Sequence, residues 1–257
     1  MGLMRVREFT QDDAHIFCTP EQMEEECVKT IKLILDIYKD FGFEDVKIYL
    51  STRPDSIYRI GSDEIWDISE KALANALEHN GYAYEINEGE GAFYGPKLEF
   101  ILRDAIGREW QCGTIQLDML LPEKFDLTYT GEDGLKHRPV MIHRVAYGSI
   151  ERFIGILIEH YAGAFPAWLA PCQVRILPIT DKQHDYAQKL YDKMFALGLR
   201  VHVDDRNEKI GYKIREAQMQ KTPYMLVIGE KEVENGTVAV RRRGEGDIGA
   251  MNQDEFV

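Results

Sequence analysis

The chain has 257 residues, of which 44% are hydrophobic and 29% are charged, and its formal net charge at pH 7 is −13. This composition is typical of a soluble globular protein with a sizeable core. No run approaches the roughly 18 uninterrupted apolar residues of a membrane span. The start of the sequence does not resemble a signal peptide, because charged residues follow residues 1–5 before any apolar run develops. The four cysteines form no C-x-x-C pair, so the sequence predicts a reduced, cytoplasmic protein with no membrane partner.

The acidic charge is confined to one part of the chain. Residues 172–257 contain 14 Lys+Arg and 14 Asp+Glu, so the first 171 residues carry the whole net charge of −13. The neutral part also includes the basic run Arg241-Arg242-Arg243. A neutral, locally basic domain beside an acidic body permits local binding to a phosphate backbone.

Two prolines bracket an apolar turn at residues 165–171, and we place a domain boundary there. The preceding region predicts a strand-rich fold with few helices. Thr19-Pro20-Glu21-Gln22 resembles a capping box with proline at the first helical position, so a helix is expected from there to about Phe41, ended by Gly42. Two more helices are expected at residues 64–80 and 149–162, and strands at residues 46–50, 97–102, 109–120 and 139–143.

After the boundary, strands and helices alternate. Strands are expected at residues 173–177, 199–203, 224–228 and 237–241, and helices at residues 181–196 and 210–220. A further helix is expected to begin at residues 252–257. This βαβα order predicts a small α/β domain with a mixed or largely parallel sheet.

Two segments carry candidate polar site residues near the start and the middle of the first region. If residues 9–17 form a strand, then Phe9, Gln11, Asp13 and His15 share one face and make a polar pocket wall. A solvated strand face explains the same pattern. The Gly-punctuated segment 90–97 presents Tyr94 and Lys97, although a simple hairpin turn is the commoner explanation.

Two later segments add further candidates. In residues 111–118, Thr114, Gln116 and Asp118 share a face, and Gln111 joins them only if a β-bulge lies at or beside Gly113. Hydrogen bonding within a buried sheet is the alternative. In residues 142–153, Arg152 falls in the first turn of a helix, where a cation is unfavourable unless an anion compensates it. A structural carboxylate or a bound nucleotide could supply that anion.

In this order, the segments FTQDDAHIF, GAFYGPK, QCGTIQLD and HR-x-x-x-GS-x-ERF resemble the threonyl-tRNA synthetases, which are class II aminoacyl-tRNA synthetases. DRNEKIG at residues 205–211 and PYMLV at residues 223–227 resemble the anticodon domain of that family. The resemblance implies an α+β catalytic domain built on an antiparallel sheet, at residues 1–169, followed by an α/β anticodon-binding domain with a mixed sheet, at residues 172–257. It implies a threonine–tRNA ligase, which activates L-threonine with ATP and Mg²⁺ and transfers it to tRNA(Thr).

The resemblance also implies residue roles. Arg5 and Arg152 match the catalytic arginines that bind ATP, with Phe9 and Arg152 on the two faces of adenine. Three further residues match family positions that line the adenylate pocket: Gln111, Thr114 and Gln116. Three others match family positions around the amino group and hydroxyl of threonine: Gln11, Asp13 and Tyr94. Contacts to the anticodon are expected from Asn207, Arg215, Glu232 and Arg241. For the last two residues, an ordinary cross-strand ion pair is the alternative.

His15 and His143 match two of the three zinc ligands of the family. A Cys-His-His set leaves the fourth position of a tetrahedral zinc open, and in the family threonine occupies it. A site that demands a hydroxyl rejects valine, which is nearly isosteric with threonine. We expect the two imidazoles to lie side by side in the catalytic sheet.

Relative to the family, the chain is expected to lack the editing region, motif 1 with much of the homodimer interface, the first motif 2 arginine and the cysteine zinc ligand. Its last helix is expected to be truncated. The 257 residues alone are therefore expected not to be fully active. The alternative is a non-catalytic RNA-binding or regulatory protein that reuses the synthetase scaffold; a prolyl- or seryl-tRNA synthetase is a weaker alternative.

Overall fold

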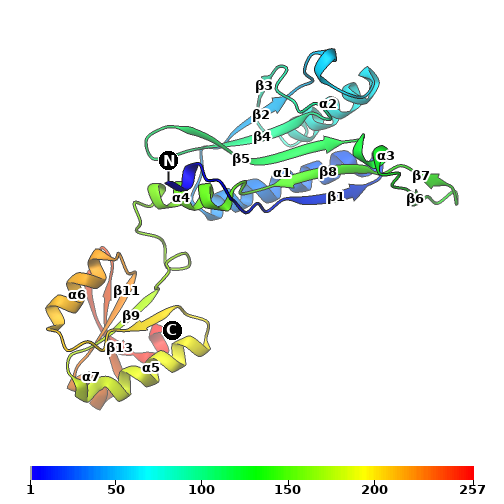
Figure 1. Ribbon diagram of the computed structural model, residues 1–257. Coiled ribbons are helices and arrows are strands. Elements are labelled where there is room, and N and C mark those ends of the chain that lie inside the picture. Colours follow the sequence, from blue (N-terminus) through cyan, green and yellow to red (C-terminus); the bar gives the residue numbers. More distant parts are fainter. Residues whose placement is uncertain (1) are drawn as a thin grey trace. The chain divides into compact units, whose positions relative to one another are not determined.

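The computed structural model describes residues 2–257; residue 1, where the expected catalytic portion starts, lies outside the described residues. The chain forms two compact units, Met1–His160 and Tyr161–Val257, which are seen in Figure 1. This division falls just upstream of the proline-bracketed turn. None of the helices in the described part of the chain combines the length and the apolar character that a bilayer crossing requires.

The first unit is built on a six-stranded sheet with the order β1-β8-β5-β4-β2-β3. All neighbouring strands are antiparallel except the edge pair β2 and β3, which is parallel. The strands of this sheet are β1 (Ala14–Cys18), β2 (Lys47–Ser51), β3 (Glu85–Asn87), β4 (Lys97–Arg103), β5 (Glu109–Asp118) and β8 (Val140–Val145). A short separate hairpin pairs β6 (Tyr129–Thr130) with β7 (Lys136–His137).

Two helices that contact each other, α1 (Met23–Asp40) and α2 (Asp63–Glu78), cover the sheet, as Figure 1 shows. The capping box expected at Thr19 and Gln22 is confirmed, since Thr19 N donates to Gln22 Oε1 at 3.0 Å. Apolar side chains at helical spacing then face the sheet, with Cys27, Ile31, Ile34 and Tyr38 all fully buried. The remaining helices of the unit are the single-turn α3 (Leu121–Lys124) and α4 (Ile150–His160).

One expected strand is shorter than the sequence suggests. Residues 9–13 are not a strand: β1 begins only at Ala14, and among residues 2–13 only Gln11 joins a ladder, through an isolated bridge to Ser149. The reason is the side chain of Asp12, whose carboxylate accepts hydrogen bonds from Ala146 N at 2.8 Å and Tyr147 N at 3.0 Å. A side chain therefore takes the donors that a continued backbone ladder would use.

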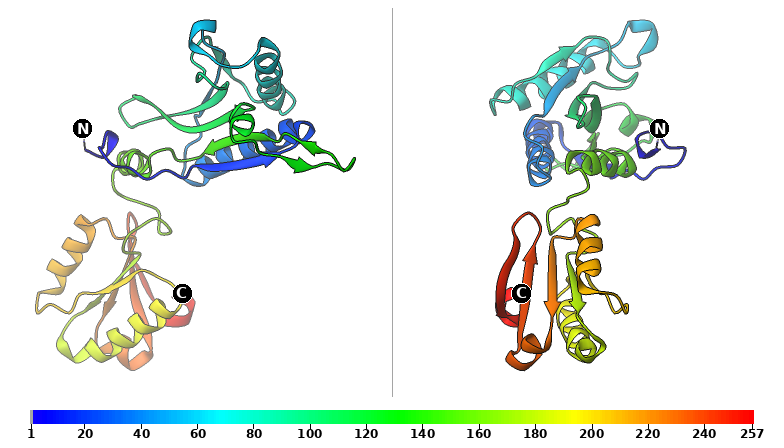
Figure 2. Two further views of the ribbon diagram at one scale, coloured as in Figure 1. Left: turned by 45° about the vertical axis from the view of Figure 1, so that its right-hand side comes forward. Right: turned by 90° about the vertical axis from the view of Figure 1, so that its left-hand side faces the viewer.

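The second unit has a five-stranded mixed sheet with the order β10-β9-β11-β12-β13. Three strands are mutually parallel, and β12 and β13 pair antiparallel to their neighbours. The strands are β9 (Val174–Pro178), β10 (Val201–Val203), β11 (Tyr224–Ile228), β12 (Thr237–Arg242) and β13 (Gly246–Asn252). The helices are α5 (His184–Ala196), α6 (Ile210–Met219), α7 (Glu230–Asn235) and α8 (Gln253–Phe256). Figure 2 shows this sheet and its helices from two further directions.

The alternation of apolar residues along the strands divides this core into two layers. Ile176 and Leu226 pack with residues of α5, whereas the next residue on one strand, Leu177, packs with Met225 and with Ala217 of α6. Because successive side chains of a strand point to opposite faces, α5 and α6 cover opposite faces of the sheet. The expected α/β order is thus confirmed, with α7 and β13 as elements that the sequence pattern did not predict.

Candidate nucleotide pocket and histidine pair

A cavity of about 340 Å³ in the first unit gathers most of the expected nucleotide-binding residues. The segment 4–11 forms one wall, β5 forms another, and the start of α4 closes it. Its lining consists of Met4, Arg5, Val6, Phe9, Gln11, Gln111, Cys112, Thr114, Val145, Gly148, Ser149 and Arg152. Of the residues expected to bind ATP, Gln116 does not line this cavity.

A β-bulge places Gln111 in this wall. In the β4–β5 ladder Gly113 pairs with Phe100 while Gln111 pairs with Ile101, so Cys112 is the extra residue. The condition under which Gln111 joins this face, a bulge beside Gly113, is therefore met. It brings Gln111 and Thr114 to the same face, where Gln111 Nε2 donates to Thr114 Oγ1 at 2.9 Å.

Arg152 lies in the first turn of α4, as the sequence indicated. A sharp turn at Gly148, with φ of 72°, leads into this helix, and a Cβ at Gly148 would lie 2.8 Å from the Cys112 carbonyl oxygen. Only glycine fits such a close backbone approach at positive φ. The turn therefore fixes where α4 begins and where Arg152 points.

The two arginines of the cavity lack carboxylate partners. Across residues 2–257, no ion pair joins Arg5 or Arg152 to an acidic side chain. Arg152 Nε donates instead to the Met4 carbonyl oxygen at 3.1 Å, and its Nη1 lies 3.5 Å from the Gln111 carbonyl oxygen. The structural carboxylate that could have explained Arg152 is absent from the described residues, which leaves two cationic groups facing a polar cavity.

A second cluster of expected site residues lies one strand further along the same sheet. His15 and His143 are direct cross-strand partners, with ring centroids 4.6 Å apart and an interplanar angle of 73°. Their expected proximity is confirmed. Across the next strand pair, His143 is in register with Gln116, and the Tyr94 hydroxyl donates to Gln116 Oε1 at 2.9 Å.

A buried carboxylate orients one of the two imidazoles. His143 Nε2 lies 2.9 Å from Asp118 Oδ2, and the Asp118 side chain is fully buried. The ring of Tyr94 lies 5.8 Å from that of His143. Burial raises the pKa of Tyr94, and the charges of Asp118 and Asp13 raise it further, so the phenol is a hydrogen-bond donor at neutral pH. Asp13 itself is exposed.

This cluster partly fits a zinc site. A carboxylate that holds an imidazole by its second nitrogen is a common feature behind metal-binding histidines. However, the described residues contain no group of three or more His, Cys, Asp or Glu side chains arranged to hold a metal ion. The donor set present is therefore two imidazoles, one of them oriented by Asp118.

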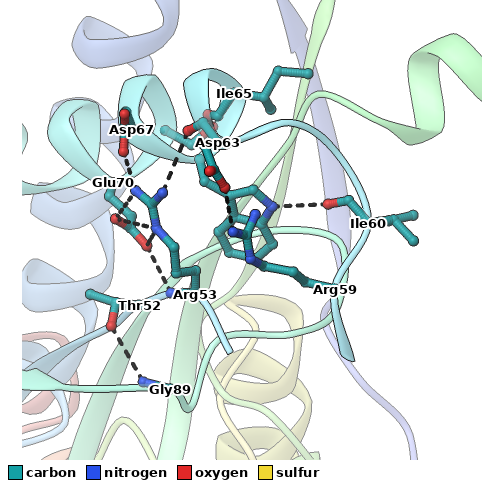
Figure 3. A network of polar contacts seen from close by, with 11 residues as sticks. Thr52, Arg53, Arg59, Ile60, Asp63, Ile65, Asp67, Glu70 and Gly89 are labelled. Carbon is teal, nitrogen blue, oxygen red and sulfur yellow. Dashed lines mark hydrogen bonds and ion pairs between the residues drawn. The ribbon is translucent and has the colours of Figure 1, made fainter. Parts of the chain in front are cut away.

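The turn that carries Tyr94 is anchored to the loop before α2. Gly91 N donates to the Thr52 carbonyl oxygen at 2.8 Å, and Ile60 N donates to the Phe93 carbonyl oxygen at 2.9 Å. Figure 3 shows the ion pairs that stiffen this loop: Arg53 joins Glu70 and Asp67. This network lies outside the motifs identified in the sequence.

A second arginine in Figure 3, Arg59, fixes the same loop; Arg53 and Arg59 with their ion-pair partners are called the brace below. Arg59 pairs with Asp63 and lies over the Trp66 ring, at 5.7 Å from its centroid. Trp66 Nε1 donates to the Ile60 carbonyl oxygen at 2.9 Å. Because Ile60 N bonds to Phe93, the loop is fixed on one side to α2 and on the other to the Tyr94 turn.

In the second unit, the residues expected to contact the anticodon do not form an internal cluster. Asn207 and Arg215 are exposed. Glu232 Oε2 accepts a hydrogen bond from Gly229 N at 2.8 Å and so caps α7. Arg241 pairs with Asp247 at 3.5 Å. The alternative that Glu232 and Arg241 form a cross-strand ion pair is therefore wrong, because each has a different partner.

Two families match the chain in adjoining segments. Residues 1–161 match the family described as tRNA synthetase class II core domain (G, H, P, S and T), and residues 173–257 match the family described as Anticodon binding domain. The chain therefore belongs to the class II aminoacyl-tRNA synthetases, with an anticodon-binding domain after the core. The antiparallel first sheet expected from the resemblance is confirmed apart from its parallel edge pair β2–β3, and so is the mixed second sheet.

Within that class, curated relatives at 60% identity or more are threonine–tRNA ligases. Those of Carboxydothermus hydrogenoformans and Clostridium tetani are 62% and 64% identical over 256 residues, and each alignment covers all of this chain. The chain spans 40% of the length of these relatives. A solved structure titled as the RNA binding domain of threonyl-tRNA synthetase from Cryptosporidium parvum has a TM-score of 0.94 at 42% identity, covering 100% of this chain and 64% of that one.

A more distant solved structure shows the same fold. A putative threonyl-tRNA synthetase from Aeropyrum pernix has a TM-score of 0.79 at 30% identity, and the match covers 98% of this chain and 60% of that chain. The fold is thus shared well beyond the bacterial relatives.

Proposed function

We propose that this sequence forms the C-terminal part of a threonine–tRNA ligase, which uses ATP and Mg²⁺ to activate L-threonine and then transfers threonine to tRNA(Thr). The observation that carries the proposal is the cavity in which Arg5 and Arg152, without carboxylate partners, meet the exposed ring of Phe9. Two guanidiniums without carboxylate partners suit the phosphates of a nucleotide. A partly exposed aromatic ring suits the stacking of a base.

In the proposed mechanism the chain mainly positions the reactants and neutralises the charge of the phosphates. The threonine carboxylate attacks the α-phosphorus of ATP and displaces pyrophosphate, which gives threonyl-adenylate. A ribose hydroxyl of the tRNA then attacks the threonyl carbonyl carbon and displaces AMP. Arg5 and Arg152 stabilise the phosphate charge, Phe9 and Arg152 hold the adenine, and Gln111 and Thr114 bind the adenylate. Such reactions need alignment and charge stabilisation more than covalent help.

Threonine is assigned to the neighbouring cluster. We place its amino and hydroxyl groups near Gln11, Asp13 and Tyr94, with Gln116 at the junction with the adenylate. His15 and His143 would hold a zinc ion there, which when bound supplies a Lewis acid for both groups of the amino acid. A third protein ligand is required, and the proposal assigns it to the upstream part of the enzyme.

The proposal extends to the remaining parts of the protein. Residues 1–169 are assigned to the aminoacylation domain and residues 172–257 to the anticodon-binding domain, with Asn207, Arg215, Glu232 and Arg241 as its contacts. The full enzyme is proposed to be a cytoplasmic homodimer.

A chimeric enzyme tests the activity. The chimera carries residues 1–257 in place of the matching region of the Clostridium tetani relative. It is expected to catalyse threonine-dependent ATP–pyrophosphate exchange, with valine inactive, and to charge tRNA(Thr). The 257-residue chain alone is expected to be far less active. A folded chimera that binds tRNA but exchanges no pyrophosphate would favour the non-catalytic RNA-binding alternative.

The anticodon assignment is tested on the tRNA. Because splayed anticodon bases expose Watson–Crick edges that carboxylates and guanidiniums read by hydrogen bonds, Glu232→Ala should reduce discrimination against an anticodon-substituted tRNA by roughly tenfold or more, about 1–3 kcal/mol. The measurement is binding of both tRNAs by the chimera at fixed salt. Glu232→Gln keeps a side-chain oxygen that can cap α7, so this variant separates the loss of the helix cap from the loss of base recognition. Equal binding of both tRNAs before any mutation would refute the assignment.

A further inference from the structure

The indole of Trp110 lies within reach of three arginines at the edge of the nucleotide cavity. The guanidinium carbons of Arg152, Arg108 and Arg5 lie 5.2, 5.5 and 6.0 Å from its ring centroid. All three fall within about 6 Å, the range of a cation–π interaction. Arg5 and Arg152 line the cavity, whereas Arg108 pairs with Asp104 and Glu159 outside it.

Trp110 is itself fixed by the turn between β4 and β5. Its Nε1 donates to Asp104 Oδ2 at 2.8 Å, and the buried Asp104 carboxylate also accepts from Ile106 N at 3.1 Å and from Arg108 N at 2.9 Å. Burial alone would raise the pKa of Asp104, but the hydrogen bonds from Trp110 and Arg108 outweigh it and lower the pKa to about 2. The carboxylate is thus charged at neutral pH and holds the edge of the indole in one place.

The two cavity arginines need such a support. They repel each other, and no carboxylate among residues 2–257 forms an ion pair with either. The negative face of an indole compensates part of that repulsion, and a planar guanidinium held near it loses little further freedom when it binds an anion. Trp110 directly precedes Gln111, so the same strand supplies the platform and part of the pocket lining.

We propose that Trp110 is a positioning residue of the nucleotide pocket, whose indole holds the guanidiniums of Arg5 and Arg152 where they receive the phosphates of ATP. This inference rests on the proposed function of the cavity as an ATP site. Trp110 acts through the two arginines and makes no contact with the reacting atoms.

The first test is calorimetric titration of ATP·Mg²⁺ into the 257-residue chain. Trp110→Leu removes the ring and is expected to weaken ATP affinity about tenfold. Trp110→Phe keeps an aromatic face and is expected to recover most of the affinity. Trp168→Leu, an equal loss of indole in the other unit, is the matched control and should leave ATP affinity unchanged. Circular dichroism verifies that each variant is folded.

A second readout separates positioning from packing. Because Trp110 lies under the arginines that ATP engages, ATP should change the tryptophan emission of the unmodified chain, and this change should be lost in Trp110→Phe although that variant still binds. Three results would overturn the positioning role of Trp110 while leaving the ATP site itself in place. They are unchanged ATP affinity in Trp110→Leu, equal loss of affinity in Trp110→Phe and Trp110→Leu, and an emission change that survives in Trp110→Phe. If the unmodified chain binds no ATP, the ATP-site proposal and this inference fall together.

Discussion

Replacement of Arg152 with alanine in the chimeric enzyme is expected to slow adenylate formation roughly a hundredfold, since the loss of one charge-assisted phosphate contact costs a few kcal/mol. Arg152 makes no ion pair with a carboxylate of the described chain, so its removal leaves no buried anion unpaired. Its contacts are backbone carbonyl groups and the Trp110 face. The fold should therefore remain intact while the chemistry slows.

The measurement is threonine-dependent ATP–pyrophosphate exchange, with circular dichroism to confirm folding. Arg103→Ala is the matched control: Arg103 is a half-exposed arginine of β4 in the same unit that pairs with Glu109 and Asp45, and surface pairs contribute about 1 kcal/mol or less. It should exchange pyrophosphate at the unmodified rate. If Arg152→Ala also did so, Arg152 would be a structural residue and the ATP site would lie elsewhere.

Much of the architecture follows from local rules that a sequence displays directly. A capping box at Thr19 and Gln22 starts the 3-10 turn Pro20–Gln22 that leads into α1, and α1 buries residues at helical spacing. In β5, a bulge lets Gln111 and Thr114 face the same way. Both features are encoded within a few residues of where they act. The same holds for the pairing of His15 with His143 once each is assigned to a neighbouring strand.

The failures have equally specific causes. The segment before β1 was expected to be a strand, but the Asp12 side chain replaces the backbone partner. The edge strand β13 runs through a glycine-rich, mostly exposed segment, so it lacks the alternation of apolar residues that marks a strand. The Asp12 contact cannot be predicted without knowing which distant segment lies alongside, whereas β13 pairs with the neighbouring strand β12 but shows no apolar pattern of its own.

The contacts that hold the cavity residues and the Tyr94 turn in place could not be predicted from the sequence either. The Trp110 ring lies within cation–π range of Arg5 and Arg152, and Asp104 accepts one hydrogen bond from Trp110 Nε1. The brace of Arg53 and Arg59 reaches the Tyr94 turn through backbone groups of Thr52 and Ile60. These contacts join segments that are separated in the chain, and backbone partners leave no trace in residue type.

The second large effect is expected from Gly95→Ala, in the turn that carries Tyr94. A Cβ at this position would lie 1.9 Å from the Leu117 carbonyl oxygen, a distance that no rotamer change can relieve because the obstacle is backbone. The turn must move away from β5, which also breaks the 3.2 Å hydrogen bond from Gln116 Nε2 to the Gly95 carbonyl oxygen. We expect a loss of about 3 kcal/mol in the free energy of unfolding of the first unit.

Differential scanning calorimetry of the 257-residue chain measures this loss. Gly95→Ala should lower the transition of the first unit by roughly 6–12 °C and leave that of the second unit in place. Gly211→Ala is the matched control, because Gly211 lies in α6 with open space around it and alanine favours a helix by about 1 kcal/mol over glycine. It should raise the transition of the second unit slightly. If the transition temperature of the first unit were unchanged in Gly95→Ala, the turn would be free to move away from β5. The close approach of Gly95 to Leu117 would then not be what holds Tyr94 against Gln116.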